Sequence, residues 1–331
     1  MRTIQIKEAL KDEHFFIDVR TPAEFEESTI PWAINIPLFS NEERAIVGKL
    51  YTQVGQKEAM EKGYEFVNEK LPQLLESVRK HKEKKLIVFC WRGGMRSKSL
   101  GMLLESIGFD VMQLEGGHKA YRNYVIEELE NYKAKGKFIV LYGMTGCGKT
   151  KMLKQFKNSL DLEGLAQHRS SLFGDIGLKP RSQKMFEALL VKRLNELKDY
   201  DHIITEGESR KIGRVVIPES IFKEMHRGIN VKVEASMEQR ICNLIECYSN
   251  KEDEKIIEKI KMLSKSLGKK RTEEMLKLFE EKKFEEVARI LLEEYYDPLY
   301  SHTINKQEYA MTITPEEIEN IKKLILLSSH I

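Results

Sequence analysis

The sequence predicts an α/β protein in which two parallel-sheet domains follow one another along a chain of 331 residues. Short apolar runs typical of strands alternate with amphipathic helical segments, and this order implies parallel sheets with helices on their faces. A glycine-rich loop directly follows two of the apolar runs, and a helix is expected after each loop. The chain is long for a single domain and comfortable for two.

The first domain is expected to cover residues 1–126. Its strands are predicted at Phe15–Val19, Lys85–Phe89 and Val111–Leu114, where apolar residues cluster in short runs. Apolar residues at helical spacing predict a helix over Ser97–Ile107, between the last two strands.

A charged helix over Lys119–Lys135 is expected to leave this domain, with Gly136 as its stop. Residues 127–136, the end of that helix, are therefore predicted to link the first domain to a second one over residues 137–331.

The second domain repeats the α/β pattern and adds a helical C-terminal part. It is expected to open with the strand Phe138–Tyr142, a glycine-rich loop and a helix over Lys151–Leu160. The further predicted elements are a helix over Gln183–Leu197, strands at His202–Thr205 and Ile229–Ala235, a helix opened by a capping box of Ser236 and Gln239, and a helical region from Glu252 to Glu294.

Composition narrows the class of protein. Hydrophobic residues make up 41% and charged residues 32%, which fits a soluble globular chain. No apolar run approaches the length of a membrane span, and the N-terminus lacks a secretory pattern. We therefore expect a cytoplasmic protein with no membrane partner. The net charge of +3 neither requires nor excludes a nucleic-acid partner.

The four cysteines are too few and too scattered for a disulfide framework. Cys242 and Cys247 lie close in sequence, but no second pair of Cys or His completes a zinc site. We read them as half-buried helix residues.

Cys90 stands at the start of the first glycine-rich loop, immediately after an apolar strand. Backbone N–H groups of such a loop and of the following helix point at one spot and attract an anion, which favours the thiolate and makes Cys90 a candidate nucleophile. Arg92 and Arg96 add positive charge, and Gly93 and Gly94 let the backbone curl without Cβ clashes.

Trp91 and Ser97 complete the predicted anion loop (CWRGGMRS, residues 90–97). Trp91 could stack on a splayed base, cover an apolar substrate chain or fill a domain interface.

Three other stretches of the first half, with this loop, resemble the rhodanese family. They are Asp18–Phe25 (DVRTPAEF), Ile30–Pro37 (IPWAINIP) and Gly116–Arg122 (GGHKAYR). Thr29 and Trp32 depart from the His and Gly of that pattern. The resemblance covers residues 5–125 and implies a rhodanese-like parallel-sheet domain.

The spacing within the loop leaves its chemistry open. Five residues separate Cys90 from Arg96, whereas rhodanese sulfurtransferases usually have one fewer, and the longer spacing also occurs in Cys-dependent phosphatases. Against a phosphatase, Phe89 precedes the cysteine in place of His, and the loop holds no Asp or Glu as a general acid.

The second glycine-rich loop, Gly143–Thr150 (GMTGCGKT), fits the P-loop pattern completely. Backbone N–H groups of such a loop wrap a diphosphate or triphosphate, Lys149 neutralises it, and the Thr150 hydroxyl can ligate Mg²⁺. The predicted phosphate-binding residues here are Gly143, Thr145, Gly146, Gly148, Lys149 and Thr150.

Glu206 and Glu208 follow the strand His202–Thr205, where a carboxylate could serve the metal or its water. Either carboxylate could instead pair with Arg210 or Lys211 in solvent. The P-loop pattern does not distinguish ATP, GTP or a prenyl diphosphate.

The combination of the two loops resembles the tRNA 2-selenouridine synthase family over nearly the whole chain. Matching stretches outside the loops are Glu42–Tyr51, Asp161–Gly174, Glu206–Gly213 and Tyr295–Tyr300. The resemblance implies a P-loop NTPase-like α/β domain with a helical C-terminal region after the rhodanese-like domain.

The resemblance also implies a reaction. Such transferases act on tRNA with 2-thiouridine at the wobble position, use geranyl diphosphate and selenophosphate as co-substrates, and have no prosthetic group. Cys90 would take up selenium as a perselenide and pass it to C2 of the S-geranyl uridine. The P-loop would hold geranyl diphosphate, although the sequence permits ATP equally, and selenophosphate synthetase is an expected donor partner.

Binding of tRNA requires contacts to phosphates. Basic residues near both loops are candidates, and the predicted tRNA-binding residues are His168, Arg169, Arg181, Arg210 and Lys211.

Two other functions remain open from the sequence. One is a Cys-dependent phosphatase or sulfurtransferase with a nucleotide-binding domain. The other is a non-catalytic, nucleotide-gated sensor, which the completeness of both loops argues against.

Overall fold

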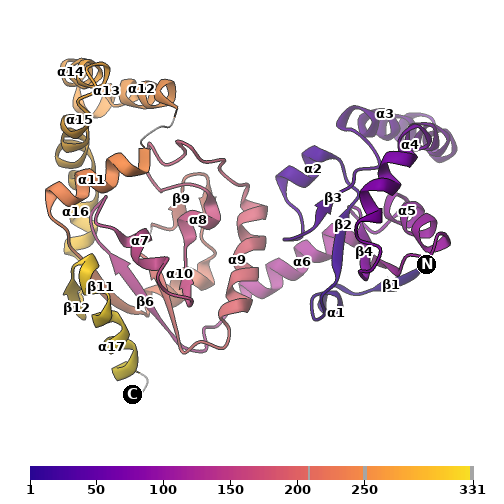
Figure 1. Cartoon of the computed structure of the whole chain (residues 1–331), viewed down its shortest axis with the longest axis horizontal. Helices are drawn as coiled ribbons and strands as arrows, with labels where there is room; N and C mark the ends of the chain where they lie inside the picture. The colour runs from indigo at the N-terminus through magenta and orange to yellow at the C-terminus, as the bar shows by residue number, and fades with distance from the viewer. Residues whose placement is uncertain (208, 249–251, 329–331) are drawn as a thin grey trace. The chain divides into compact units, whose positions relative to one another are not determined.

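The computed structural model describes residues 1–207, 209–248 and 252–328. The chain divides into two compact units, here called unit 1 and unit 2. Unit 1 holds Met1–Leu129 with Lys184–Lys192, and unit 2 holds Glu130–Gln183 with the chain from Arg193 onward. Each unit contains a five-stranded sheet in which every neighbouring pair is parallel (Figure 1). The predicted α/β class is confirmed.

The sheet of unit 1 has the strand order β1-β5-β4-β2-β3. In chain order the strands are β1 (Arg2–Ile4), β2 (Phe15–Asp18), β3 (Ile34–Asn35), β4 (Leu86–Phe89) and β5 (Val111–Leu114). All four residues of β4, at the centre of the sheet, are buried. The helices are α1 (Ile6–Ala9), α2 (Pro22–Glu27), α3 (Asn41–Gln53), α4 (Gln56–Arg79), α5 (Met95–Ser106) and α6 (Gly117–Glu130).

The helices α3 and α4 lie side by side on the same side of unit 1 as α5 (Figure 1). No helix is predicted from the sequence over either range. Helix α3 buries none of its side chains completely, whereas α4 buries Ala59, Gly63, Leu74 and Val78.

The sheet of unit 2 has the order β12-β11-β6-β8-β7. In chain order these strands are β6 (Lys137–Tyr142), β7 (Ser159–Leu160), β8 (His202–Glu206), β11 (Ile229–Val233) and β12 (Met311–Ile313). A separate antiparallel hairpin joins β9 (Lys211–Ile212) to β10 (Val215–Val216).

Short helices surround the sheet of unit 2, and a helical region gathers at one end of it (Figure 1). The helices up to that region are α7 (Lys149–Leu153), α8 (Leu162–Ala166), α9 (Gln183–Leu197), α10 (Glu219–His226) and α11 (Met237–Tyr248). Residues 184–192 of α9 belong to unit 1. The region itself comprises α12 (Asp253–Met262), α13 (Ser264–Leu267), α14 (Lys269–Glu280), α15 (Phe284–Ile290), a π-helix (Leu291–Tyr296) and α16 (Asp297–Asn305), and a 3₁₀ turn (Pro315–Glu317) and α17 (Glu319–Ser328) follow.

Two predicted helices have different bounds in the structure. The helix expected over Lys151–Leu160 is wrong beyond Leu153, because Leu160 joins β7 at the sheet edge and pairs with Thr205 of β8. Helix α6 ends at Glu130 and not at Gly136. A Cβ on Gly136 would lie 1.7 Å from the carbonyl oxygen of Asp201, so this glycine permits a close backbone approach.

Across the described ranges, no helix is both long enough and apolar enough to cross a membrane.

Candidate functional site

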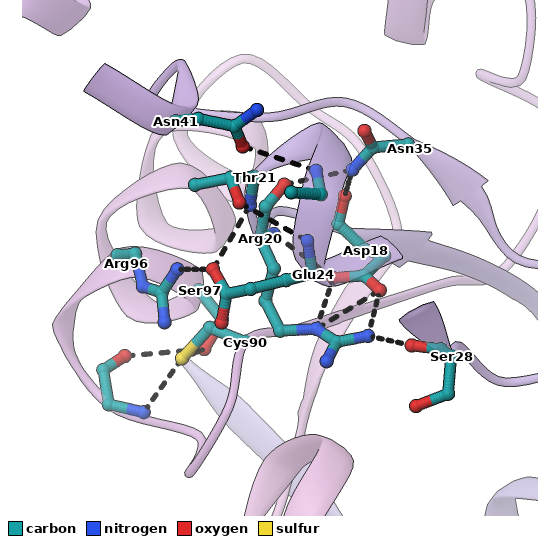
Figure 2. A network of polar contacts seen from close by, with 12 residues as sticks. Asp18, Arg20, Thr21, Glu24, Ser28, Asn35, Asn41, Cys90, Arg96 and Ser97 are labelled. Carbon is teal, nitrogen blue, oxygen red and sulfur yellow. Dashed lines mark hydrogen bonds and ion pairs between the residues drawn. The ribbon is translucent and has the colours of Figure 1, made fainter. Parts of the chain in front are cut away.

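The Cys90 thiol lies at the carboxyl end of the central strand β4. Its side chain is buried, and its Sγ accepts hydrogen bonds from the Gly94 N–H at 3.1 Å and the Ser97 hydroxyl at 3.2 Å (Figure 2). Both donors come from the loop and the first turn of α5, so the loop directs two polar hydrogens at the sulfur.

The side chain of Gln113 on β5 holds the loop by hydrogen bonds. This residue was not identified from the sequence. Its buried side-chain amide donates to the carbonyl oxygens of Gly93 (2.9 Å) and Gly94 (3.2 Å) and to the Ser97 hydroxyl (2.8 Å). These bonds fix the two loop carbonyls and the Ser97 hydroxyl, which itself donates to Cys90 Sγ. A polar residue inside the otherwise apolar run VMQL was the available signal.

The two glycines of the loop have different roles. Gly93 has φ +64°, and a Cβ there would lie 2.7 Å from the carbonyl oxygen of Leu114. Gly94 has φ −94°, and a Cβ there would meet nothing within 4 Å. The backbone therefore requires glycine at position 93, whereas a Cβ at position 94 would meet no other protein atom.

The two loop arginines are not equivalent. Arg92 is exposed, whereas Arg96 is half-buried and forms an ion pair with Glu24 of α2, with 2.8 Å between Nη1 and Oε2 (Figure 2). Burial raises the pKa of Glu24, but the hydrogen bond and charge of Arg96, with the Thr21 N–H and Arg20, outweigh it and hold the pKa below its ordinary value. The positive charge of Arg96 is thus shared with a carboxylate, a partner that the sequence analysis missed.

A fully buried ion pair underlies this region. Arg20 donates through Nε and Nη2 to Asp18, and also to the Ser28 carbonyl at 2.6 Å. The Thr29 hydroxyl donates to Asp18 Oδ2 at 2.9 Å, so the residue that departs from the rhodanese pattern satisfies the buried carboxylate. Trp32, the other departure, has φ +74°, a conformation that favours glycine.

His118 lies behind the loop and is fully buried. Its backbone N–H donates to the Cys90 carbonyl at 2.8 Å, and its ring centroid lies 5.6 Å from that of Trp91. Burial, followed by the charges of Arg20, Lys184 and Arg122, lowers the pKa of His118 to about 3. The imidazole is therefore neutral at ordinary pH, and Trp91 packs against it.

The P-loop follows the central strand β6 of unit 2. Gly146 and Gly148 have φ +83° and +95°, and a Cβ on Gly143 would lie 2.4 Å from the Val233 carbonyl oxygen. Lys149 donates from Nζ to the Gly143 carbonyl oxygen at 2.7 Å, so its ammonium group contacts the first residue of its own loop.

Side chains of α11 hold the carbonyls of the P-loop. Arg240 donates from Nε to the Thr145 carbonyl at 2.9 Å, and Asn243 donates to the Gly146 carbonyl at 2.7 Å. Asp297 binds the Arg240 guanidinium through both carboxylate oxygens, at 3.0 and 2.5 Å. Asp297, in the stretch Tyr295–Tyr300, therefore orients the residue that positions the loop.

A cavity of about 460 Å³ opens at the P-loop. The six predicted phosphate-binding residues from Gly143 to Thr150 line it, together with Glu163, Arg169 and the aromatic rings of Tyr142, Phe222, Tyr248 and Tyr300. The oxygen donors Thr150 and Glu163 are of the kind that Mg²⁺ prefers, so the residues present fit this ion.

Glu206 pairs in register with Leu141 of β6, the strand that leads into the P-loop. It is the last residue of β8, is almost fully buried, and accepts the Glu163 N–H at 2.9 Å. It is not among the residues that line the cavity, whereas Glu163 is. Glu208 lies outside the described residues.

The predicted tRNA-binding residues are spread over unit 2. The His168 ring packs against the backbones of Gly174 and Gly213, and Arg181 donates to the Gly164 and Leu165 carbonyls at the end of α8. Both side chains are engaged inside the unit, so they are poorly placed for phosphates.

Arg169 lines the P-loop cavity and stacks over Tyr248, with 5.4 Å from Cζ to the ring centroid. Arg210 and Lys211 are exposed at the β9–β10 hairpin, and Arg210 pairs with Glu219 at 2.7 Å. Of the five candidates, these two on the hairpin are the most accessible.

Within the part of the chain that the structure describes, no group of three or more His, Cys, Asp or Glu side chains could hold a metal ion.

Comparison with known proteins connects the two loops to one family. The model of the rhodanese-like domain matches residues 4–124, and the model described as the tRNA 2-selenouridine synthase AAA domain matches residues 136–326. This chain belongs to the tRNA 2-selenouridine synthase family.

Relatives in this family match over most of their length. A tRNA 2-selenouridine synthase from Hydrogenovibrio crunogenus is 35% identical over 88% of this chain and 90% of its own, and one from Sulfurovum sp. is 32% identical over 88% of each. Among solved structures, the N-terminal domain of an ATP/GTP-binding protein from Clostridium difficile 630 is 46% identical, covering 38% of this chain and 98% of its own with a TM-score of 0.37.

Proposed function

We propose that this chain acts in the cytoplasm as a transferase that converts wobble 2-thiouridine of tRNA to 2-selenouridine, through an S-geranyl intermediate. One observation carries the proposal: a single chain holds a buried thiol in an anion-binding loop and, separately, a P-loop that opens onto a cavity with an apolar wall. Its relatives named tRNA 2-selenouridine synthase support the overall reaction.

The P-loop cavity would bind geranyl diphosphate. Loop N–H groups and Lys149 suit the diphosphate, and Phe222, Leu299 and Ile304 line the same cavity as an apolar surface for the hydrocarbon chain. The same cavity is also lined by polar side chains, among them Ser209, His226 and Gln307, which are the kind of partner that a nucleotide base or ribose would use.

In the first step, the uridine sulfur forms a bond to the geranyl carbon, and the carbon–oxygen bond to diphosphate breaks. The proton on N3 is lost, and the electron pair leaves with the diphosphate. Lys149 and the loop N–H groups would stabilise this leaving group. Thr150 and Glu163 would hold Mg²⁺, which supplies Lewis-acid stabilisation of the diphosphate when bound.

In the second step, selenium replaces the alkylated sulfur at C2. Overall, S-geranyl uridine, selenophosphate and water give 2-selenouridine, geranyl thiol and phosphate, so no external oxidant or reductant is required. The Cys90 loop would bind selenophosphate, which selenophosphate synthetase would supply. Selenium in selenophosphate is at the selenide level, so the perselenide on Cys90 that the resemblance implies would need an oxidant and is not part of this proposal. Alkylation makes this exchange feasible because a thiolate is a better leaving group than sulfide.

Exposed cations of the β9–β10 hairpin would contact tRNA phosphates. Arg210 and Lys211 are the accessible members of the predicted set, and each phosphate contact adds a salt-dependent contribution to affinity.

The test separates the two steps by using two RNA substrates. Full-length protein is incubated with tRNA that carries 2-thiouridine, geranyl diphosphate and selenophosphate, or with tRNA that already carries S-geranyl-2-thiouridine and selenophosphate. Nucleosides are then identified by mass spectrometry. We expect Cys90→Ala to stop at the geranylated nucleoside, and to lower the selenation rate by about 10³-fold or more.

Lys149→Ala should lower the geranylation rate about 10²- to 10³-fold, while selenation of the preformed S-geranyl substrate continues. Retained geranylation in Lys149→Ala would contradict the assignment of the P-loop ligand. If the wild type makes neither nucleoside but hydrolyses aryl phosphates or transfers sulfur from thiosulfate without tRNA, the phosphatase or sulfurtransferase alternative replaces the proposal. Cys242→Ala, at an exposed thiol, is the matched control for Cys90→Ala.

A further inference from the structure

A second cavity lies in unit 1, beside the Cys90 loop. Its volume is about 770 Å³, and helices α3, α4 and α5 form most of its wall. We call it the α3–α5 groove. The lining is mainly apolar and includes Tyr51 of α3, Tyr64 and Val67 of α4, and Met95 and Leu103 of α5. Neither the family match nor the proposed mechanism assigns it a role.

The groove exposes large apolar side chains that a folded protein usually covers. Tyr51, Tyr64 and Met95 are 61%, 56% and 48% exposed, and all three line this one groove. Helix α3 has no completely buried side chain. An apolar concavity of this size is in the range of about 300–1,000 Å³ that small-molecule sites occupy, and exposed apolar patches generally mark binding sites.

The groove is continuous with the thiol site through the chain itself. Met95 and Arg96 line the groove and directly follow Gly94, whose N–H donates to Cys90 Sγ. Arg96 also forms the ion pair with Glu24 at the loop (Figure 2). Met95 and Arg96 thus belong both to the wall of the groove and to the loop that holds the thiol.

We infer that the α3–α5 groove binds the hydrocarbon chain of the S-alkylated uridine while selenium replaces its sulfur. This inference rests on the proposed function, in which unit 1 receives a uridine that carries an allylic hydrocarbon chain. The chain is the one apolar part of an otherwise polar and charged RNA substrate, and the groove is an apolar surface beside the reacting thiol. Held there, the chain places its sulfur, the leaving group, at the mouth of the loop.

The experiment compares two preformed substrates with the full-length protein and selenophosphate. Anticodon stem-loop RNAs carry either S-geranyl- or S-methyl-2-thiouridine at the wobble position, and kcat and KM for 2-selenouridine formation are measured for each. We expect the wild type to favour the S-geranyl RNA about 10- to 100-fold in kcat/KM, mainly through KM, because only its chain fills the groove.

Tyr64→Asp places a charge in the groove at a side chain exposed enough to tolerate substitution. It should lower kcat/KM for the S-geranyl RNA to the value for the S-methyl RNA and leave the S-methyl value unchanged, and Tyr51→Asp should act in the same direction. Met102→Asp is the matched control, because Met102 is 52% exposed on the same helix α5 and does not line the groove. It should change neither value.

Three outcomes would overturn the inference. Equal kcat/KM for both RNAs in the wild type excludes a chain-binding site. Equal losses for both RNAs in Tyr64→Asp would show that the residue serves RNA binding or folding instead. If the wild type selenates neither RNA, the proposed function itself fails and the groove assignment fails with it.

Discussion

The Cys90 loop and the P-loop are built on the same plan. Each follows the central strand of a five-stranded parallel sheet, β4 in unit 1 and β6 in unit 2, and a helix begins directly after each loop. Ligands of open α/β sheets bind at the carboxyl ends of the strands, so both loops stand where the fold favours an anion.

The loops differ in how their cations are held. Arg96 pairs with the carboxylate of Glu24, and one of the contacts of the Lys149 ammonium group is the carbonyl of Gly143. An anion that binds at the Cys90 loop must compete with a charged partner for Arg96. Position in the fold therefore makes both loops anion-binding, but the surrounding side chains decide how strongly each attracts an anion.

The loops also differ in their support. Gln113, a neutral amide on a neighbouring strand, holds the carbonyls of the Cys90 loop. The carbonyls of the P-loop are held by Asn243 and by Arg240, a buried arginine that pairs with the partly exposed Asp297. Removing a partner of a buried charge costs more than altering a neutral contact, so the P-loop should be the more sensitive of the two to a single substitution in its support.

The largest effect is expected at the charged support. Asp297→Asn leaves Arg240 buried without its counter-charge and should destabilise unit 2 by about 3 kcal/mol. It should also weaken the binding of inorganic diphosphate about tenfold, because Arg240 no longer fixes the Thr145 carbonyl. Urea unfolding followed by circular dichroism and titration calorimetry measure the two effects. Glu238→Gln, at a side chain that is 77% exposed, is the control, and an unchanged stability in Asp297→Asn would refute this role.

An intermediate effect is expected on acidification of unit 1. The pKa of His118 is about 3 in the folded state and 6.5 ordinarily, so the unfolded chain binds a proton first as the pH falls. The free energy of unfolding of unit 1 should decrease by up to about 1.4 kcal/mol per pH unit below pH 6.5, until the folded-state pKa is reached. At pH 5 the loss is about 2 kcal/mol.

Both tryptophans, Trp32 and Trp91, belong to unit 1, so tryptophan fluorescence during urea unfolding reports this unit within the full-length protein. His118→Asn should reduce the pH dependence, whereas His302→Asn, at an exposed histidine, should leave it intact. An identical pH dependence in His118→Asn and wild type would show that other groups cause it.

The smallest effect is expected at the ion pair between Arg96 and Glu24. Glu24→Gln keeps an acceptor for the Thr21 N–H but removes the charge opposite Arg96. Because this pair is partly exposed, unit 1 should lose no more than about 1 kcal/mol. Released from the carboxylate, Arg96 should bind selenophosphate more tightly, with a KM about two- to tenfold lower. A higher KM would mean that Glu24 positions Arg96 for the anion, and Glu26→Gln on the same helix is the control.

Much of this architecture follows from local patterns. The central strands β4 and β6 and both loops lie where the apolar runs and glycines predict them, because buried parallel strands require continuous apolar residues and a tight loop with positive φ requires glycine. The groove-forming helices α3 and α4 escaped prediction in the sequence analysis. The spacing of Phe156 and Leu160 predicts a helix over the short strand β7. In the structure, the pairing of β7 with β8 outweighs this local periodicity.

The chemistry of the loops likewise depends on contiguous sequence patterns and on contacts between residues that are distant in the chain. Cys90, Lys149 and Thr150 could be identified from sequence, since each belongs to a contiguous pattern whose spacing reflects the backbone geometry that the anion requires. Glu24, Gln113 and Asp297 could not, because each acts on a residue far away in the chain. Local spacing determines where a loop can bind an anion, whereas folding alone brings together the distant side chains that set its charge and rigidity.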